Sequence, residues 1–134
     1  MKAYTDLEQS KTLSKILPIE SADMWYHGHC SPWESEREYD SEACPFHSMS
    51  PNWDKPCWSL AALLDVLPPY LFEFERGIDL NIYPNLNGKG WHCSYMPNAI
   101  ENMKNDKFKL IMSEDNLVDA CYEIIIKLKE NNLI

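Results

Sequence analysis

The sequence is short of positive charge, since 12 Lys and Arg residues face 21 Asp and Glu residues and the formal net charge is -9. Nucleic-acid backbones and anionic membrane surfaces are bound by clustered basic residues, and no basic run occurs in this chain. We therefore expect no direct nucleic-acid binding and no membrane binding. A basic protein partner, or a role as an acidic mimic of nucleic acid, stays open.

Long apolar runs are missing as well. No run approaches the roughly 18 residues that a membrane-spanning helix needs. The first residues, "MKAYTDLEQSK", are polar where a secretory signal has an apolar stretch. The five cysteines are an odd number without the spacing of a disulfide framework, so we expect reduced thiols and a cytoplasmic protein.

Internal repeats, low-complexity tracts and Gly/Ser-rich linkers are also absent from the 134 residues. This length is typical of one domain with a core that needs no disulfide support. We therefore predict a single domain over residues 1–134, with a long irregular loop at about residues 28–56 and a second one at residues 97–106.

Apolar residues at helical spacing predict a helix within "YTDLEQSKTLSKILP", residues 4–18. Thr5 and Glu8 have the spacing of a capping box, and Pro18 ends the pattern. The first predicted helix therefore begins close to Thr5.

A second helix is predicted within residues 54–69, where Ser59 or Asp54 could cap the N-terminus and Pro68 forbids continuation. A third is predicted within residues 114–134, with capping by Asn116. The expected apolar stripes are Leu60, Leu63, Leu64 and Leu67 in the second helix, and Leu117, Cys121, Ile124 and Leu128, widened by Val118 and Ile125, in the third.

Apolar residues alternate with polar ones on either side of "PNLNGKG", residues 84–90, whose Asn-Gly pair is typical of a turn. This pattern predicts a β-hairpin, and further strands are predicted in residues 107–113 and 21–27. The expected fold class is α+β, with a small antiparallel sheet covered by about three helices. The alternating apolar residues of the hairpin are Ile78, Leu80, Ile82, Trp91, Cys93 and Tyr95.

Three segments, "LEQSKTLSKILPIESADMWY", "PCWSLAALLDVLP" and "LVDACYEIIIKLKENNL", resemble a family of small uncharacterised proteins from gut bacteria and their phages or prophages. The likeness covers about half of the chain and mainly its predicted helices and one strand. It implies an α+β cytoplasmic accessory protein in a mobile-element setting. It transfers no activity and no functional residue.

The stretch "HGHCSPWESEREYDSEACPFH", residues 27–47, holds three of the four histidines and two of the five cysteines. Zinc is commonly bound by two close pairs of Cys and His ligands joined by a loop. The absence of a C-x-x-C pair and the acidic connector favour an ordinary solvated loop, with a structural zinc site as the alternative. The candidate ligands are His27, His29, Cys30, Cys44 and His47.

Catalytic chemistry has weaker support. Catalytic zinc would need a general base, for which Glu34 and Glu36 are candidates by proximity alone. Cys57 precedes the second predicted helix, whose dipole could make it a nucleophile, although a packed helix start explains it equally well. Cys93 and Cys121 fall on apolar faces and are expected in the core, and His92 is expected to face solvent. We therefore expect no enzyme activity and no cofactor.

Aromatic residues gather in or beside the long loop, where they could anchor a protein interface or pin the loop to the sheet. The leading hypothesis is a non-enzymatic accessory or protein-interaction domain. A zinc-stabilised domain and an acidic nucleic-acid mimic are the alternatives. The candidate interface residues are Trp33, Tyr39, Phe46 and Trp53.

Overall fold

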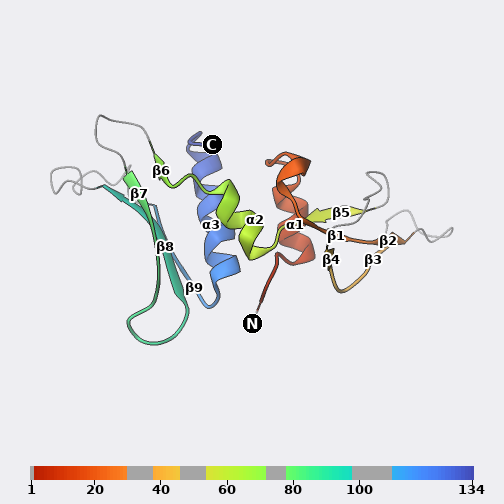
Figure 1. Cartoon of the computed structure of the whole chain (residues 1–134), viewed down its shortest axis with the longest axis horizontal. Coiled ribbons are helices and arrows are strands. Elements are labelled where there is room, and N and C mark those ends of the chain that lie inside the picture. Colours follow the sequence, from red (N-terminus) through yellow and green to blue (C-terminus); the bar gives the residue numbers. More distant parts are fainter. Residues whose placement is uncertain (1, 30–37, 46–53, 72–77, 98–109) are drawn as a thin grey trace. The chain divides into compact units, whose positions relative to one another are not determined.

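The computed structural model describes residues 2–29, 38–45, 54–71, 78–97 and 110–134. It has the predicted α+β class, with helices and small antiparallel sheets (Figure 1). The chain divides into two compact units, one of residues 3–63 and one of residues 1–2 with 64–134, and each is described by itself. Among the described residues, no helix has the length and apolar character needed to cross a bilayer.

The first unit begins with helix α1, Leu7–Leu13. Its N-cap is Asp6, whose carboxylate accepts from the backbone N–H of Gln9, while the Gln9 side chain accepts from the Asp6 N–H. This is a capping box one residue later than the predicted pair of Thr5 and Glu8. The prediction of a helix here is confirmed, but the predicted cap is wrong because Thr5 is fully buried and its hydroxyl is used elsewhere.

Two small sheets follow α1 and the short 3-10 helix η1, Ile19–Ser21. The predicted strand in residues 21–27 is β1, Met24–Tyr26, and it lies between two partners in a three-stranded sheet. The second sheet has two strands. The remaining strands of the first unit are β2, Gly28–His29; β3, Glu38–Tyr39; β4, Cys44–Pro45; and β5, Lys55–Cys57.

The predicted irregular loop at residues 28–56 is therefore corrected in its described part, where these short strands form. β1 pairs with β4 and with β5, and β2 pairs with β3, all antiparallel. Such strands of two or three residues carry no readable alternation, so sequence pattern alone does not reveal them. Most of the second predicted loop, residues 97–106, lies outside the described residues.

Helix α2, Leu60–Val66, contains the boundary between the two units. The Ser59 hydroxyl accepts from the Ala62 N–H at 3.2 Å, so Ser59 rather than Asp54 caps the helix. Leu63 is fully buried, but Leu64 is 37% exposed, so the predicted stripe is wrong at Leu64. The other three leucines are covered, since Leu63 and Leu67 are buried and Leu60 is half-buried.

The second unit is built on a four-stranded antiparallel sheet in the order β6-β7-β8-β9. The predicted hairpin is confirmed as β7 and β8, and the predicted strand in residues 107–113 is β9. In its register, Ile82, Cys93 and Met112 form one cross-strand row, and Tyr83, His92 and Ser113 form the next. The bounds are Tyr70–Leu71 for β6, Ile78–Pro84 for β7, Trp91–Pro97 for β8 and Leu110–Glu114 for β9.

Helix α3, Leu117–Glu130, packs against β8 and β9 (Figure 1). The Asn116 side chain caps it by accepting from the Asp119 N–H at 2.8 Å, as predicted. Cys93 on β8 and Cys121 on α3 are both fully buried, so α3 covers the sheet face that carries the Ile82–Cys93–Met112 row. The predicted stripe is confirmed except for Leu117, which is only half-buried; its fully buried members are Val118, Cys121, Ile124, Ile125 and Leu128.

Candidate functional site

The candidate zinc ligands are only partly described, because Cys30 and His47 lie outside the described residues. His27 pairs with Asp54 at 3.3 Å, and His29 pairs with Asp40. Cys44 lies on β4, where it pairs with β1. Within the described ranges, no three His, Cys, Asp or Glu side chains gather in a way that could hold a metal ion. The zinc hypothesis stays a prediction, because two of its five candidate ligands lie outside the described residues.

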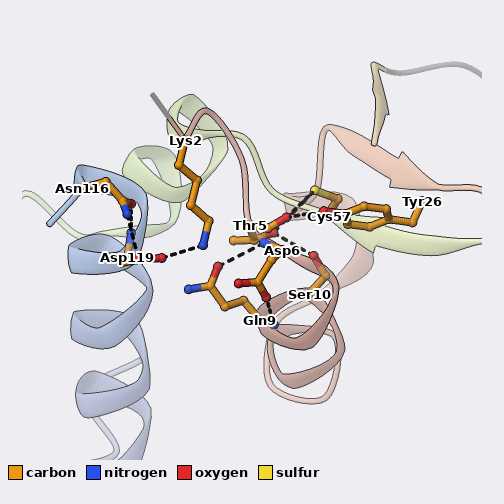
Figure 2. A network of polar contacts seen from close by, with 9 residues as sticks. All are labelled: Lys2, Thr5, Asp6, Gln9, Ser10, Tyr26, Cys57, Asn116 and Asp119. Carbon is orange, nitrogen blue, oxygen red and sulfur yellow. Dashed lines mark hydrogen bonds and ion pairs between the residues drawn. The ribbon is translucent and has the colours of Figure 1, made fainter. Parts of the chain in front are cut away.

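Cys57, the candidate nucleophile, is fully buried on β5 in a polar network around Thr5 (Figure 2). The Thr5 hydroxyl lies 2.8 Å from the Ser10 hydroxyl and 3.5 Å from the Cys57 sulfur, and it accepts from the Trp58 N–H at 3.2 Å. Burial raises the pKa of the Cys57 thiol, whereas a nucleophile needs a lowered pKa and access. This environment disfavours a nucleophilic role and indicates a structural one.

The same network holds the backbone of the N-terminal segment. Tyr26 donates its hydroxyl hydrogen to the Thr5 carbonyl at 2.8 Å, and burial raises the pKa of Tyr26 (Figure 2). The Thr5 N–H also donates to the Trp58 carbonyl at 2.9 Å. Every hydrogen-bonding group of Thr5 thus has a partner, as expected of a buried polar residue.

In the second unit, Lys2 forms an ion pair with Asp119, 2.7 Å from Nζ to Oδ1 (Figure 2). The other carboxylate oxygen of Asp119 accepts from the Asn116 side chain at 2.7 Å. Asp119 lies in the first turn of α3, where a carboxylate is favoured by the helix dipole. These contacts strengthen the start of α3 and leave Asp119 engaged in structure.

A different arrangement occupies the tip of the β7–β8 hairpin, residues 83–92, which we call the hairpin tip. Asn85 fixes its turn: the side-chain amide donates to the Lys89 carbonyl and to the Ser113 hydroxyl, both at 2.9 Å. The Asn85 N–H also donates to the Gly90 carbonyl at 3.1 Å. Gly88 and Gly90 adopt positive φ angles of 75° and 78°, which other residues rarely adopt. The turn is therefore held by its own hydrogen bonds and by one strand of the sheet.

The hairpin tip presents apolar side chains outward. Leu86 is fully exposed in the turn, and Tyr83 is 45% exposed on β7. The Tyr83 ring stacks on His92 of β8, with centroids 4.4 Å apart and planes inclined by 18°. This cross-strand pair belongs to the row that faces away from α3. A stacked aromatic pair beside an exposed leucine, on a rigid turn, is the kind of surface that anchors a protein partner.

The charge near the hairpin tip is mixed. Lys89 is exposed within the turn, whereas Glu114 is the last residue of β9 and Asp115 follows it. A Cβ added at Gly90 would meet the Glu114 carbonyl oxygen. Burial, and then the neighbouring carboxylates of Glu123, Asp119 and Asp115, raise the pKa of Glu114. Negative charge is therefore concentrated where β9 leads into α3.

The predicted interface residues contribute little that can be described. Trp33, Phe46 and Trp53 lie outside the described residues, and Tyr39 is half-buried on β3. His92, predicted to face solvent, lies half-buried on the sheet face turned away from α3, where it stacks on Tyr83. The sequence reasoning missed Tyr83 and Leu86. The signal that could have found them is an apolar residue, Leu86, between two asparagines in a turn that otherwise favours polar residues.

No protein-family model matches the chain, and the comparisons with curated proteins and with solved structures gave no significant match either. The resemblance to a family of small proteins from gut bacteria and their phages therefore stays a prediction.

Proposed function

We propose that the chain is a non-enzymatic accessory domain that binds a protein partner through the hairpin tip. The observation that carries the proposal is the full exposure of Leu86 on a turn that Asn85 holds in place. A leucine in water gains nothing for folding, whereas its transfer into an apolar pocket of a partner contributes about 1.5–3 kcal/mol. The turn lowers the entropy cost of binding because the side chain is already presented.

The partner that suits this surface is a protein with an apolar pocket for Leu86, a flat contact for the Tyr83–His92 stack and a basic rim. The first two requirements follow from the exposed leucine and from the 45% exposure of Tyr83. The basic rim follows from the net charge of -9 and from the carboxylates of Glu114 and Asp115. Opposite charges at the rim of an interface raise the association rate and make it depend on salt.

A photo-crosslinking amino acid placed at residue 86 would test the proposal in cells that express the full chain. The matched control places the same amino acid at residue 19, because Ile19 is another exposed large apolar side chain, 40% exposed, in the other unit. We expect position 86 to capture one protein that position 19 does not. Failure to capture a protein at position 86, or equal capture at both positions, would contradict the proposal.

The captured protein would then be purified and its affinity measured for wild type, Leu86→Asp and Ile19→Asp. We expect Leu86→Asp to weaken binding at least about tenfold, a loss of roughly 1.4 kcal/mol, and Ile19→Asp to leave it unchanged. The melting temperature of Leu86→Asp should stay close to that of wild type, since the side chain is fully exposed. Affinity should also fall as salt is raised. Wild-type affinity in Leu86→Asp would refute the assignment of the hairpin tip.

A further inference from the structure

The turn of the hairpin tip contains an asparagine that is followed directly by a glycine, Asn87 and Gly88. Every other asparagine of the sequence precedes a residue with a side chain. Asn87 and Gly88 are both exposed, and a Cβ added at Gly88 would meet nothing within 4 Å. Water and hydroxide ion therefore reach the peptide group between these two residues in the folded protein.

A hydrogen bond folds the Asn87 side chain back over the main chain. Its Oδ1 accepts from the backbone N–H of Lys89 at 2.9 Å, two residues further along. An asparagine that bonds in this way to the backbone two residues on closes a small turn of its own, which spans the peptide group in between. The side-chain carbonyl carbon of Asn87 is thus held on the side of the Gly88 nitrogen.

We propose that Asn87 is a site of spontaneous deamidation, and that its isoaspartate product weakens the binding of a partner to the hairpin tip. The reaction needs water alone, and it replaces the side-chain amide of Asn87 by a carboxylate. The effect on binding rests on the proposed function of the hairpin tip. The modification itself does not, because it follows from the chemistry of the turn.

The reaction balances in two steps. Hydroxide removes the proton of the Gly88 N–H, the nitrogen attacks Cγ of Asn87, and the bond from Cγ to Nδ2 breaks. The side-chain nitrogen takes protons from water and leaves as ammonia, which restores the hydroxide and leaves a cyclic imide. Water then adds to one of the two imide carbonyl carbons and the bond from that carbon to the Gly88 nitrogen breaks, which gives aspartate or isoaspartate. One water is consumed and one ammonia is released in total.

The hydrogen bonds of the turn act on both reacting groups. As the nitrogen adds to Cγ, negative charge develops on Asn87 Oδ1, and the Lys89 N–H that already donates to this oxygen stabilises the charge. The Gly88 N–H donates to the Asn85 carbonyl at 3.0 Å, so this hydrogen bond has to open first. Opening costs little in an exposed turn, and Gly88 has no side chain to block the approach of Cγ. The folded chain therefore permits the reaction.

Isoaspartate changes the geometry of the turn, because the main chain then runs through the former side chain of residue 87 and gains a methylene group. The Lys89 N–H loses the acceptor that folds the turn, and the bond from the Gly88 N–H to the Asn85 carbonyl loses its spacing. Leu86 lies directly before the inserted group. Its side chain is then no longer presented in the fixed position on which binding of the partner depends.

The test of the modification uses the full wild-type chain, folded and incubated at neutral and at mildly alkaline pH. Peptides are mapped by mass spectrometry, with fragmentation that distinguishes aspartate from isoaspartate. We expect conversion at Asn87 that becomes faster as pH rises, because hydroxide is the base. A synthetic peptide of residues 83–92 gives the rate without the fold, and the folded chain should react no more than about tenfold more slowly.

Asn85 is the matched internal control within the same turn. It precedes Leu86, and its amide donates to the Lys89 carbonyl and to the Ser113 hydroxyl, so we expect it to stay intact. The modification is refuted if Asn87 keeps its amide in the folded chain while the synthetic peptide reacts, if Asn85 reacts as fast, or if the rate does not depend on pH. These outcomes are read from mass without a partner, so they are distinct from a failure of the proposed function.

The effect on binding is measured with the protein captured at position 86. The isoaspartate form is separated from fresh wild type by ion exchange and compared with the variant Asn87→Asp, which carries the same added charge on a main chain of normal length. We expect the isoaspartate form to bind at least about tenfold more weakly than wild type, and Asn87→Asp to bind nearly as well as wild type. Wild-type affinity of the isoaspartate form, or equal weakening in Asn87→Asp, would overturn the inference about the turn.

Discussion

Tyr83 on β7 and His92 on β8 stack face to face across the hairpin, with their ring centroids 4.4 Å apart. The pair stands directly opposite in the register and lies on the sheet face turned away from α3. The stack leaves Tyr83 45% exposed while fixing its ring. A fixed, exposed aromatic ring loses little conformational entropy when a partner binds it, which is why this pair belongs to the proposed contact surface.

The stack should be measurable as a coupling energy. A double-mutant cycle with Tyr83→Ala, His92→Ala and the double variant should give about 0.5–1.5 kcal/mol of favourable interaction, the range known for aromatic pairs. Urea unfolding of the four proteins provides the free energies. Additive effects of the two single substitutions would show that the rings lie side by side without stabilising the hairpin.

Alanine substitution should lower the free energy of unfolding more at Gly90 than at Gly88. An added Cβ at Gly90 would lie 2.3 Å from the Glu114 carbonyl oxygen, whereas one at Gly88 would meet nothing within 4 Å. Both residues have positive φ, so each alanine substitution should cost about 1–2 kcal/mol for backbone strain. Gly90→Ala should cost about 1–3 kcal/mol more, because β9 must move. Urea unfolding of both variants checks the difference, and equal losses would contradict it.

The buried network around Thr5 should be sensitive to the loss of one hydroxyl. Thr5→Val keeps the shape but leaves the Ser10 hydroxyl and the Trp58 N–H without the Thr5 oxygen. We expect a loss of about 1–3 kcal/mol in the free energy of unfolding. Thr12→Val is the matched control, because the Thr12 hydroxyl only donates to the Glu8 carbonyl at the surface of α1. Comparable melting temperatures for the two variants would show that the network contributes nothing.

Glu114 should make stability depend on pH. Its pKa in the folded protein is raised above the ordinary value of 4.5, first by burial and then by Glu123, so the folded state holds this proton more tightly than the unfolded state. The stabilising contribution is complete below pH 4.5 and is lost as pH rises through the folded pKa. Glu114→Gln should therefore melt higher than wild type near neutral pH, and the difference should shrink as pH falls to about 4.

Melting curves of the two proteins between about pH 4 and pH 8 measure this difference. The control is Asp65→Asn, which removes an exposed carboxylate of α2 that belongs to the same unit. We expect the control to show no such growth of the difference with pH. A Glu114→Gln difference that is the same at every pH would contradict the prediction.

The sequence by itself determined the elements whose pattern is local and long enough to read. The alternation on either side of residues 84–90 predicted the β7–β8 hairpin, and the spacing of Cys121, Ile124 and Leu128 predicted α3. These elements carry a full period of buried and exposed positions, so hydrophobic burial selects one structure for them. The α+β class was predictable because the sequence holds both the helical spacing of apolar residues and the alternation that is typical of strands.

Where two local sequence patterns are equally good, only the tertiary structure decided which one forms. Thr5 with Glu8 and Asp6 with Gln9 have the same capping-box spacing, and Asp6 became the cap because Thr5 was taken into the core by Ser10 and Trp58. The short strands β2 to β5 are likewise defined by partners elsewhere in the chain, since two or three residues hold no period of their own.

The tertiary structure also decided which side chains are buried in the core and which are presented at the hairpin tip. Cys93 and Cys121 were each predictable as core residues from the pattern of their own element, but their full burial depends on how α3 lies on the sheet. The exposure of Leu86 depends on the hydrogen bonds of Asn85, one of which reaches across to Ser113 on β9. Side-chain periodicity specifies which face of an element is buried, whereas the pairing of particular side chains from separate elements is set by packing and register, which no local pattern encodes.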